Sequence, residues 1–373
     1  MTSDRKLKTH NRLIKRSIKG IIGTILSIVT LFFVFSWIAE YRPEERETTL
    51  YDKIRPECLP DTITVVSWNI GYAGLGDNMD FFYDGGLRVR DSRERTALNL
   101  HEIIRVLKNI NADLILLQEV DMDSHRSYGI REVDSLQKAF PGYHLSFAYN
   151  YKVHWVPIPL KNPIGRVNSG VVTLSRIGPF KTERIQYPSA FSFPVRLFNL
   201  KRCMLSSYFL TASGDTLIVN NTHNTAYDAG GMRDTEMNFL AQELKSSQTP
   251  HTQTLTGGDW NQYPPGYTPS TEELSNEYFI PQKVDETLFG EKFRFAFDAQ
   301  TPSLRYLDHV WANTDTPRPC TTLTDFFLLA SSIKILSVET LPLEFKWSDH
   351  NPVLLKITIP PHQDSTSKES AQK

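Results

Sequence analysis

The chain has 373 residues, of which 40% are hydrophobic and 22% are charged, so it can bury one large core or two small ones. Its net charge of −1 hides an asymmetry. Residues 1–42 carry eight Lys or Arg and two Asp or Glu, which leaves 33 Lys or Arg and 40 Asp or Glu for the rest. A domain with this excess of acidic residues lacks the basic surface of a non-specific nucleic-acid binder, although a local basic groove remains compatible with it.

The N-terminal segment has the pattern of a membrane anchor. Residues 1–19 are polar and basic, and residues 20–39 form an uncharged run long enough for a helix that spans a bilayer. A single run predicts a single-pass membrane protein. Because a basic flank stays in the cytoplasm, everything after Glu40 is expected on the other side of the membrane. A cleaved signal peptide is the alternative, but the run is long for one and its best cleavage site, Val34-x-Ser36, is weak. Residues 40–60 are predicted to be a linker.

From residue 61 the chain alternates buried strands with amphipathic helices and shows no convincing linker. Leu100, Ile103, Ile104 and Leu107 have helical spacing and predict a helix over 93–110, with further helices near 131–140 and around 237–244. Strands are predicted for 61–70, 113–117, 143–149, 168–175, 204–211, 216–221, 252–255, 306–312, 325–329, 333–338 and 352–359. The three cysteines have no zinc-binding spacing. We therefore expect one domain over 61–360 and a disordered tail at 361–373.

The segment 256–261, Thr-Gly-Gly-Asp-Trp-Asn, is the most informative stretch of the chain. It follows a run that is typical of a buried strand, so Asp259 and Asn261 are expected where that strand ends. A carboxylate beside an amide can orient a water molecule and bind a phosphate oxygen. Taken alone, the same residues would be better explained as an ordinary turn.

Other predicted strands also end in polar residues of the same few types. Loops at strand ends are where sites gather in α/β folds, so these residues are candidates for one site. They are Asn69, Glu119, His223, Asp259, Asn261, Asp308 and the pair Asp349-His350.

Six short motifs, in order along the chain, resemble those of the endonuclease/exonuclease/phosphatase superfamily, which includes DNase I-like nucleases. They are 66–70 (VSWNI), 117–120 (LQEV), 221–224 (NTHN), 258–261 (GDWN), 307–310 (LDHV) and 348–353 (SDHNPV). The resemblance covers about residues 61–360. It implies an α/β fold, a four-layer α/β sandwich with two packed mixed β-sheets.

The resemblance also implies a divalent cation, for which Mg²⁺ is the first expectation and Mn²⁺ an alternative. Mg²⁺ takes oxygen ligands and needs few carboxylates, because water and substrate complete its coordination. Glu119 is the first candidate ligand, with Asn69 and Asp349 as further candidates. For Asn69 the cap of a turn is the alternative, and Asp349 could instead set the geometry of the site.

The catalytic roles carried over are those of an in-line hydrolysis of a phosphoester. Asp259 would deprotonate the attacking water and Asn261 would bind the phosphate. His350 would face the developing charge, oriented by Asp308 as in a carboxylate–imidazole pair. His223 would protonate the leaving group or bind phosphate, with a loop hydrogen bond as the alternative.

Substrate contacts are less well defined by the sequence. Asn168 is a candidate phosphate contact, and Arg88, Arg90 and Arg233 could hold an anionic group, although solvated surface arginine explains each of them. The aromatic loops at 151–160 and 187–198 could touch a bilayer, and core packing explains them almost as well.

The expected function is therefore a membrane-anchored, Mg²⁺-dependent phosphoesterase with an extracytoplasmic catalytic domain and a lipid or small-molecule phosphoester as substrate. One alternative is an extracytoplasmic nuclease, although nucleic acid is not favoured. The other is a non-catalytic domain that binds a phosphorylated partner. No protein partner can be inferred.

Overall fold

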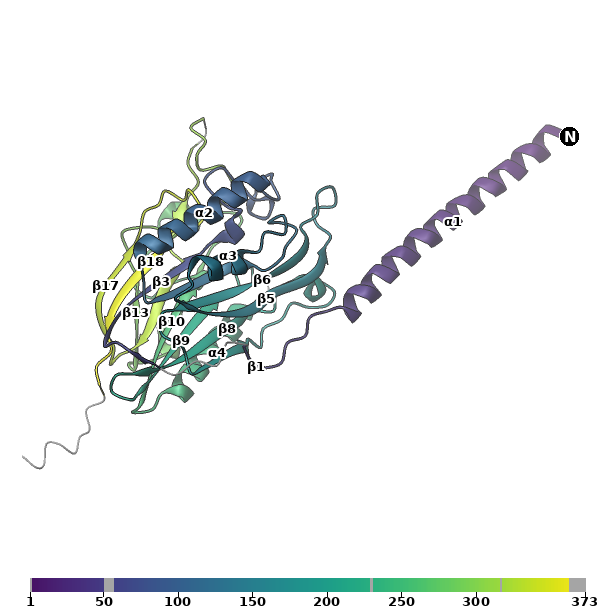
Figure 1. The fold of residues 1–373 in the computed structure, drawn as a ribbon. Coiled ribbons are helices and arrows are strands. Elements are labelled where there is room, and N and C mark those ends of the chain that lie inside the picture. Colours follow the sequence, from purple (N-terminus) through teal and green to yellow (C-terminus); the bar gives the residue numbers. More distant parts are fainter. Residues whose placement is uncertain (1, 50–56, 229–230, 316, 362–373) are drawn as a thin grey trace, which may run out of the picture.

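Two β-sheets packed face to face form the centre of the domain (Figure 1). The computed structural model describes residues 2–49, 57–228, 231–315 and 317–361. The larger sheet has the order β1 (Arg46–Thr48), β7 (Lys181–Gln186), β8 (Cys203–Thr211), β9 (Thr216–His223), β10 (Thr252–Asp259), β16 (Asp325–Ala330) and β13 (Phe293–Ala296), with β2 (Cys58–Leu59) beside β8. The smaller sheet has the order β17 (Lys334–Thr340), β18 (Val353–Thr358), β3 (Thr62–Asn69), β4 (Leu114–Asp121), β6 (Gly165–Ser175) and β5 (His144–Val156).

Both sheets are mixed: each contains a parallel pair at its centre, and in the larger sheet β2 is also parallel to β8. β3 runs parallel to β4, and β9 runs parallel to β10. These central strands are buried on both faces, which explains their nearly continuous hydrophobic sequences. In β3, Val65 packs between the sheets while its neighbour Val66 packs under the outer helices. Adjacent side chains thus serve two different cores.

Helices cover the outer face of each sheet. α2 (Arg93–Ile110) and α3 (Glu132–Ala139) pack on the smaller sheet, and α4 (Met232–Ser247) packs on the larger one. Ser92 caps α2 by accepting a hydrogen bond from the Arg95 backbone N–H. The predicted four-layer sandwich is confirmed.

Shorter elements complete the described structure. They are η1 (Gly71–Ala73), η2 (Phe82–Asp84), η3 (Val195–Phe198), η4 (Glu286–Leu288), α5 (Thr271–Leu274), and the pairs β11 (Gln262–Tyr263) with β12 (Gln282–Lys283) and β14 (Leu304–Arg305) with β15 (Thr321–Thr322).

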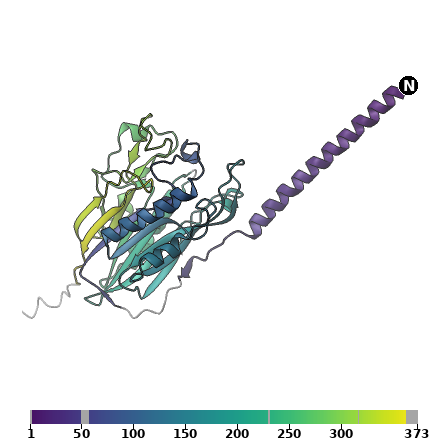
Figure 2. The same ribbon diagram turned by 45° about the horizontal axis from the view of Figure 1, so that its top comes forward.

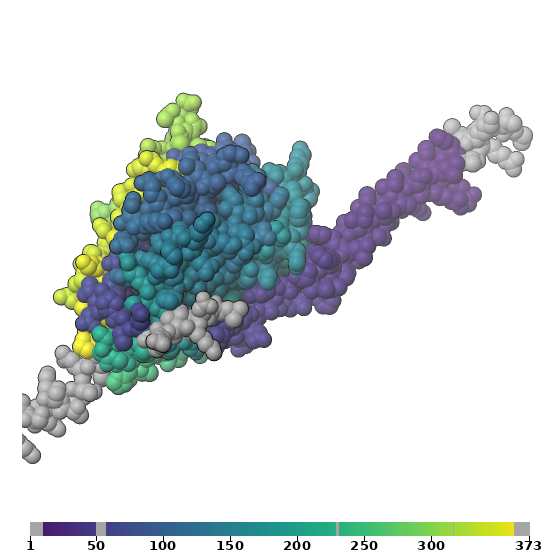
Figure 3. Space-filling view, in the orientation of Figure 1, coloured from purple at the N-terminus to yellow at the C-terminus, as the bar shows by residue number. Residues whose placement is uncertain are grey.

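The helix α1 (Thr2–Ile38) stands clear of the domain over most of its length (Figure 3). Within it, His10–Ile38 is long and apolar enough to cross a membrane, and a signal sequence near an N-terminus passes the same test. The helix leaves the domain on the side of β5 and β6 (Figures 1 and 2).

Three predictions about the elements need correction. Residues 306–312 are not a strand, because the chain leaves the short pair β14–β15 after Arg305. The predicted linker 40–60 contributes β1 and β2 to the larger sheet, and both are too short to show a hydrophobic period. The strands β7 and β13 were not predicted at all. The predicted tail lies, from residue 362 on, outside the described residues.

Candidate active site

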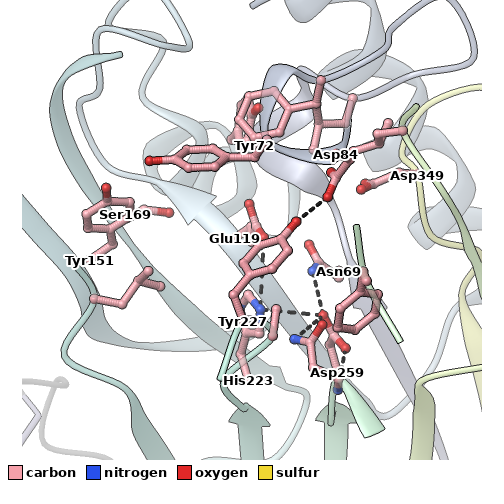
Figure 4. A pocket seen from close by; sticks show the side chains of 18 of the residues that line it. Asn69, Tyr72, Asp84, Glu119, Tyr151, Ser169, His223, Tyr227, Asp259 and Asp349 are labelled. Atoms are coloured by element: carbon pink, nitrogen blue, oxygen red, sulfur yellow. Dashed lines mark hydrogen bonds and ion pairs between the residues drawn. The ribbon is translucent and has the colours of Figure 1, made fainter. Parts of the chain in front are cut away.

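The parallel pairs bring four strand ends to one edge of the sandwich. Asn69 is in register with Gln118 across β3 and β4, and His223 is in register with Asp259 across β9 and β10. The two sheets meet there through a hydrogen bond of 3.0 Å from Asn69 Nδ2 to Asp259 Oδ2 (Figure 4). The convergence therefore follows from the packing of the sheets.

Asp259 lies at the centre of the polar cluster and is buried. Its Oδ1 accepts a 3.0 Å hydrogen bond from the backbone N–H of Asn261, and its Oδ2 lies 3.2 Å from Nδ2 of the same residue. The Nε2 atoms of His223 and His350 lie 3.4 Å and 3.8 Å from Asp259 Oδ2. Burial raises the pKa of Asp259 to about 7.

A glycine is required just before this carboxylate. Gly258 has φ +153°, and a Cβ placed on it would lie 1.9 Å from the carbonyl oxygen of Thr222 on the neighbouring strand. Only a residue without a side chain allows β9 and β10 to pair this closely beside Asp259.

His350 is oriented by Asp325, which corrects the predicted role of Asp308. His350 Nδ1 lies 2.8 Å from Asp325 Oδ2, and both side chains are buried. Burial lowers the pKa of His350, but the carboxylates of Asp325 and Asp259 raise it more, to about 10. Asp308 lies in the irregular segment after β14 and pairs instead with its exposed neighbour His309, at 2.9 Å.

The sequence contained a signal for Asp325. It is the first residue of the buried strand β16, and it is in register with Asp259 on β10. The role of orienting His350 is predicted for Asp308 because the Asp-His pair of the motif 307–310 follows two hydrophobic residues. In the structure, no strand contains the residues of that motif.

Glu119 and Asp349 face the same cavity as Asp259 (Figure 4). Glu119 lies where the pairing of β4 with β6 shifts register, has φ +54°, and has a side chain that is 26% exposed. Its Oε1 lies 3.9 Å from His223 Nε2. Burial raises the pKa of Asp349, the nearby His350 lowers it, and Glu119 raises it further. Carboxylate oxygens from several segments thus line the cavity.

Two sets of residues could hold a metal ion. Asp259, Asp325 and His350 place ligand atoms within 4.8 Å of one another. In that set His350 Nδ1 is already hydrogen-bonded to Asp325, so we interpret it as an acid–imidazole relay. The oxygen donors of Glu119 and Asp349 suit a hard divalent cation better.

Of the two remaining predicted phosphate contacts, His223 lines the cavity and Asn168 does not. Burial lowers the pKa of His223 well below its usual value, and the positive charge of Arg202 lowers it further, so the imidazole is neutral. Asn168 does not line the cavity, whereas the next residue on β6, Ser169, does. Successive residues of a strand face opposite sides, which removes Asn168 from the predicted phosphate contacts.

The cationic side chains of the cavity were not predicted. Arg88, Arg90 and Arg233 do not line it; the arginines that do are Arg126, Arg202 and Arg305. All three are buried or nearly so, and Arg126 stacks on the ring of Tyr72 at 3.7 Å. Its Nη1 lies 3.6 Å from Glu119 Oε2. These residues were missed because their positions depend on contacts between distant segments.

The cavity has a volume of about 480 Å³, and its walls are mostly aromatic and aliphatic. Opposite Asp259, the hydroxyl of Tyr227 donates a hydrogen bond to Asp84 (Figure 4). Burial raises the pKa of Asp84 to about 7. The wall residues are Tyr72, Leu75, Phe81, Tyr83, Val89, Tyr151, Ile164, Phe191, Val195, Leu200, Ala226, Tyr227, Phe279, Leu304, Tyr306 and Leu307.

Two packed mixed sheets with a polar cluster at their shared edge define a DNase I-like α/β sandwich. The profile of the Endonuclease/Exonuclease/phosphatase family matches residues 66–350, so the chain belongs to that family. An endonuclease/exonuclease/phosphatase from Beutenbergia cavernae is similar in structure, with a TM-score of 0.54 and 16% identity over 80% of this chain and 72% of that one. A humanized TDP2 from D. rerio has a TM-score of 0.50 and 14% identity over 80% and 99%. No curated protein matched the chain.

Proposed function

We propose that this protein is a membrane-anchored, divalent-cation-dependent hydrolase of a phosphodiester or phosphomonoester. The observation that carries the proposal is the set of contacts around one buried carboxylate. Asn69, His223, Asn261 and His350 all lie within 4 Å of Asp259, in a cavity that Glu119 also lines. Such convergence of acid, base and amide groups is what attack by water on phosphorus needs.

Asp259 serves as the general base. A base is most effective when its pKa lies near the working pH, and the pKa of this carboxyl group is raised to about 7. The amides of Asn69 and Asn261 hold it in one orientation. The amide of Asn261 also donates to the carbonyl of Asn224 at 3.0 Å, so its position is fixed from two sides.

His350 stabilises the charge that develops on the phosphoryl oxygens. Its imidazolium is maintained by Asp325, and Nε2 is the atom left to face the substrate. A preorganised donor of this kind is worth about 10²–10³-fold in rate. His223, which is neutral, is suited to hydrogen-bond the phosphate or the leaving group.

The donor set fits a hard divalent cation, Mg²⁺ or Mn²⁺. Glu119 and Asp349 would hold it through carboxylate oxygens, and when bound it supplies positive charge to the phosphoryl group. Asn69 stays a further candidate ligand, because its Oδ1 accepts only one hydrogen bond, from the backbone N–H of Gly71, and has a second lone pair. Its Nδ2 also positions Asp259.

The helix α1 supports anchoring in a membrane, with the basic N-terminus in the cytoplasm and the catalytic domain on the other side. The apolar walls of the cavity favour a lipid or small-molecule phosphoester over duplex DNA.

The direct test uses the full chain in detergent micelles, with a panel of phosphodiesters and phosphomonoesters in Mg²⁺, in Mn²⁺ and in EDTA. We expect turnover with either metal, none in EDTA, and a kcat at least about 10²-fold lower for Asp259→Asn. Hydrolysis of plasmid DNA alone would replace the proposal with a nuclease. Metal binding without turnover of any substrate would indicate a phosphate-binding domain and overturn the proposal.

A further inference from the structure

The last turns of α1 contact two loops of the domain rather than leading into a free linker. Phe32 stacks on Phe198 of η3 with ring centroids 5.6 Å apart, and Phe33 lies 6.0 Å from the same ring. Phe35 lies 6.0 Å from His154 at the end of β5. Three aromatic residues of the apolar helix therefore pack on the domain itself.

Ion pairs fix this arrangement immediately after the helix. Glu40, whose side chain is buried, lies 2.8 Å from Lys201 Nζ and 3.5 Å from Arg196 Nε. Arg42 donates a 2.8 Å hydrogen bond to the carbonyl of Trp37, which closes the helix end. Direct contacts thus fix the position of the two loops relative to the end of α1.

The contacts determine how deep the loops lie relative to the anchor. The uncharged run 20–39 is about 30 Å long as a helix, which matches the hydrocarbon core of a bilayer. Phe32 lies seven residues before Ala39, or about 10 Å along the axis at 1.5 Å per residue. If α1 spans the bilayer with this run, Phe198 and its neighbours lie at the depth of the bilayer surface or below it.

The same two loops expose large apolar side chains that the domain does not cover. Leu160, in the loop between β5 and β6, is 86% exposed, and Trp155, near the end of β5, is 43% exposed. In the segment before η3, Phe193 is 61% exposed. Ile158 and Val195 are also exposed. Packing in the domain core therefore does not explain these side chains, and clusters of this kind mark contact surfaces.

Both of these loops contribute residues to the wall of the cavity. Tyr151 and Ile164, at the two sides of the β5–β6 loop, line it, and so do Phe191 and Val195. Val195 is both a cavity wall and an exposed residue. Val195 thus joins the exposed apolar surface to the cavity that also contains Asp259.

We propose that the loops 154–164 and 191–198 insert into the interfacial layer of the bilayer that α1 crosses, so that the cavity takes its phosphoester from a lipid in that bilayer. The choice of substrate rests on the proposed hydrolase function, whereas the membrane contact does not. Lys152 precedes the first loop, Lys161 lies within it and Arg196 belongs to the second, so basic side chains are available for lipid phosphates.

The membrane contact is tested without any need for activity. The full chain, with Cys58→Ser and Leu160→Cys, is labelled with a fluorophore and reconstituted into phosphatidylcholine vesicles that contain brominated acyl chains. Ala212→Cys is the control, since it lies in the turn after β8, about 30 Å along that strand from the end near Arg202. We expect at least about twofold quenching at position 160 and none at 212. Equal fluorescence with and without bromine at position 160 would overturn the contact.

The substrate class is tested with the double variant Leu160→Ser, Phe193→Ser. Its rate on soluble bis(p-nitrophenyl) phosphate should remain within about twofold of wild type. Its rate on vesicles of phosphatidylcholine carrying phosphatidylglycerol and phosphatidic acid should fall at least about tenfold. The matched control is Leu336→Ser, on an apolar residue 44% exposed on β17, at the opposite edge of the smaller sheet from β5.

Each outcome separates the two proposals. Equal losses on soluble and vesicle substrates, or wild-type hydrolysis of the soluble substrate alone, would overturn the lipid assignment while the hydrolase proposal stands. A wild-type protein that hydrolyses neither substrate would refute both the hydrolase and the lipid substrate. The quenching result would then decide the membrane contact by itself.

Discussion

The substitution Asp325→Asn tests which carboxylate holds the imidazole of His350. Asp325 Oδ2 and His350 Nδ1 are 2.8 Å apart and buried. A hydrogen bond to a charged group in such a setting is worth about 1.5–3 kcal/mol. At 1.36 kcal/mol per factor of ten, its loss corresponds to a fall in kcat of about 10- to 150-fold. KM should change little, because the imidazolium is needed chiefly for the transition state.

The pH profile gives a readout that a purely structural role would not change. Burial lowers the pKa of His350 and the carboxylates of Asp325 and Asp259 raise it to about 10, so the imidazolium persists well above neutral pH. Removing the charge of Asp325 lowers that pKa. The alkaline limb of kcat against pH should therefore move to lower pH in Asp325→Asn.

The matched control is Asp308→Asn. Asp308 pairs with His309 near the surface, and its side chain is 24% exposed. Pairs of that kind contribute about 0–1 kcal/mol, so kcat should change less than about fivefold. Both variants are assayed on bis(p-nitrophenyl) phosphate with Mg²⁺, beside their thermal unfolding midpoints. A wild-type rate and pH profile for Asp325→Asn, or a larger loss for Asp308→Asn, would refute the reasoning.

Three further predictions concern the metal, the cavity and the backbone. Glu119→Gln should raise the Mg²⁺ concentration for half-maximal activity at least about tenfold, measured by titration, since it removes a proposed ligand charge. The pKa of Asp84 is raised in the folded state, so the free energy of unfolding falls as pH rises from about 4 to 7. Over that pH range, measured in EDTA, the thermal unfolding midpoint of Asp84→Asn should therefore fall less than that of the wild type. Gly71→Ala should lower the free energy of unfolding by about 1–2 kcal/mol, because Gly71 has φ +51° and a Cβ there would lie 2.8 Å from Asp349 Oδ1. An unchanged thermal unfolding midpoint would contradict this.

The parts of the fold that the sequence predicts are those determined by local pattern. α2 extends over the predicted residues 93–110, because Ser92 supplies a cap and its buried residues repeat with helical spacing. The strand before Asp259 was predicted too short, at 252–255 against 252–259, since Gly257 and Gly258 are weak strand formers. Local pattern thus identifies an element and leaves its end uncertain.

The site required information that no single segment carries. Asp308 follows a hydrophobic residue and Asp325 precedes a hydrophobic run, and only the register of β16 with β10 places Asp325 beside His350. The buried Arg126 is recruited by Tyr72 and Asp121, from two other segments. Such choices are made by tertiary packing, which overrides local preference.

The contact of α1 with the domain is a second feature that the sequence left open. The apolar run and the aromatic loop 187–198 were each visible, but nothing in their spacing joins Phe32 to Phe198. That contact joins α1 to η3, which also contributes Val195 to the wall of the cavity.

The position of the bound cation tests the central claim most directly. Crystals of the full chain grown with Mn²⁺ and measured at the manganese absorption edge would locate the ion by its anomalous signal. The account predicts a peak between the carboxylates of Glu119 and Asp349, in the cavity that holds Asp259 and His350. A peak at Asp325 instead, or manganese bound only outside this cavity, would contradict it.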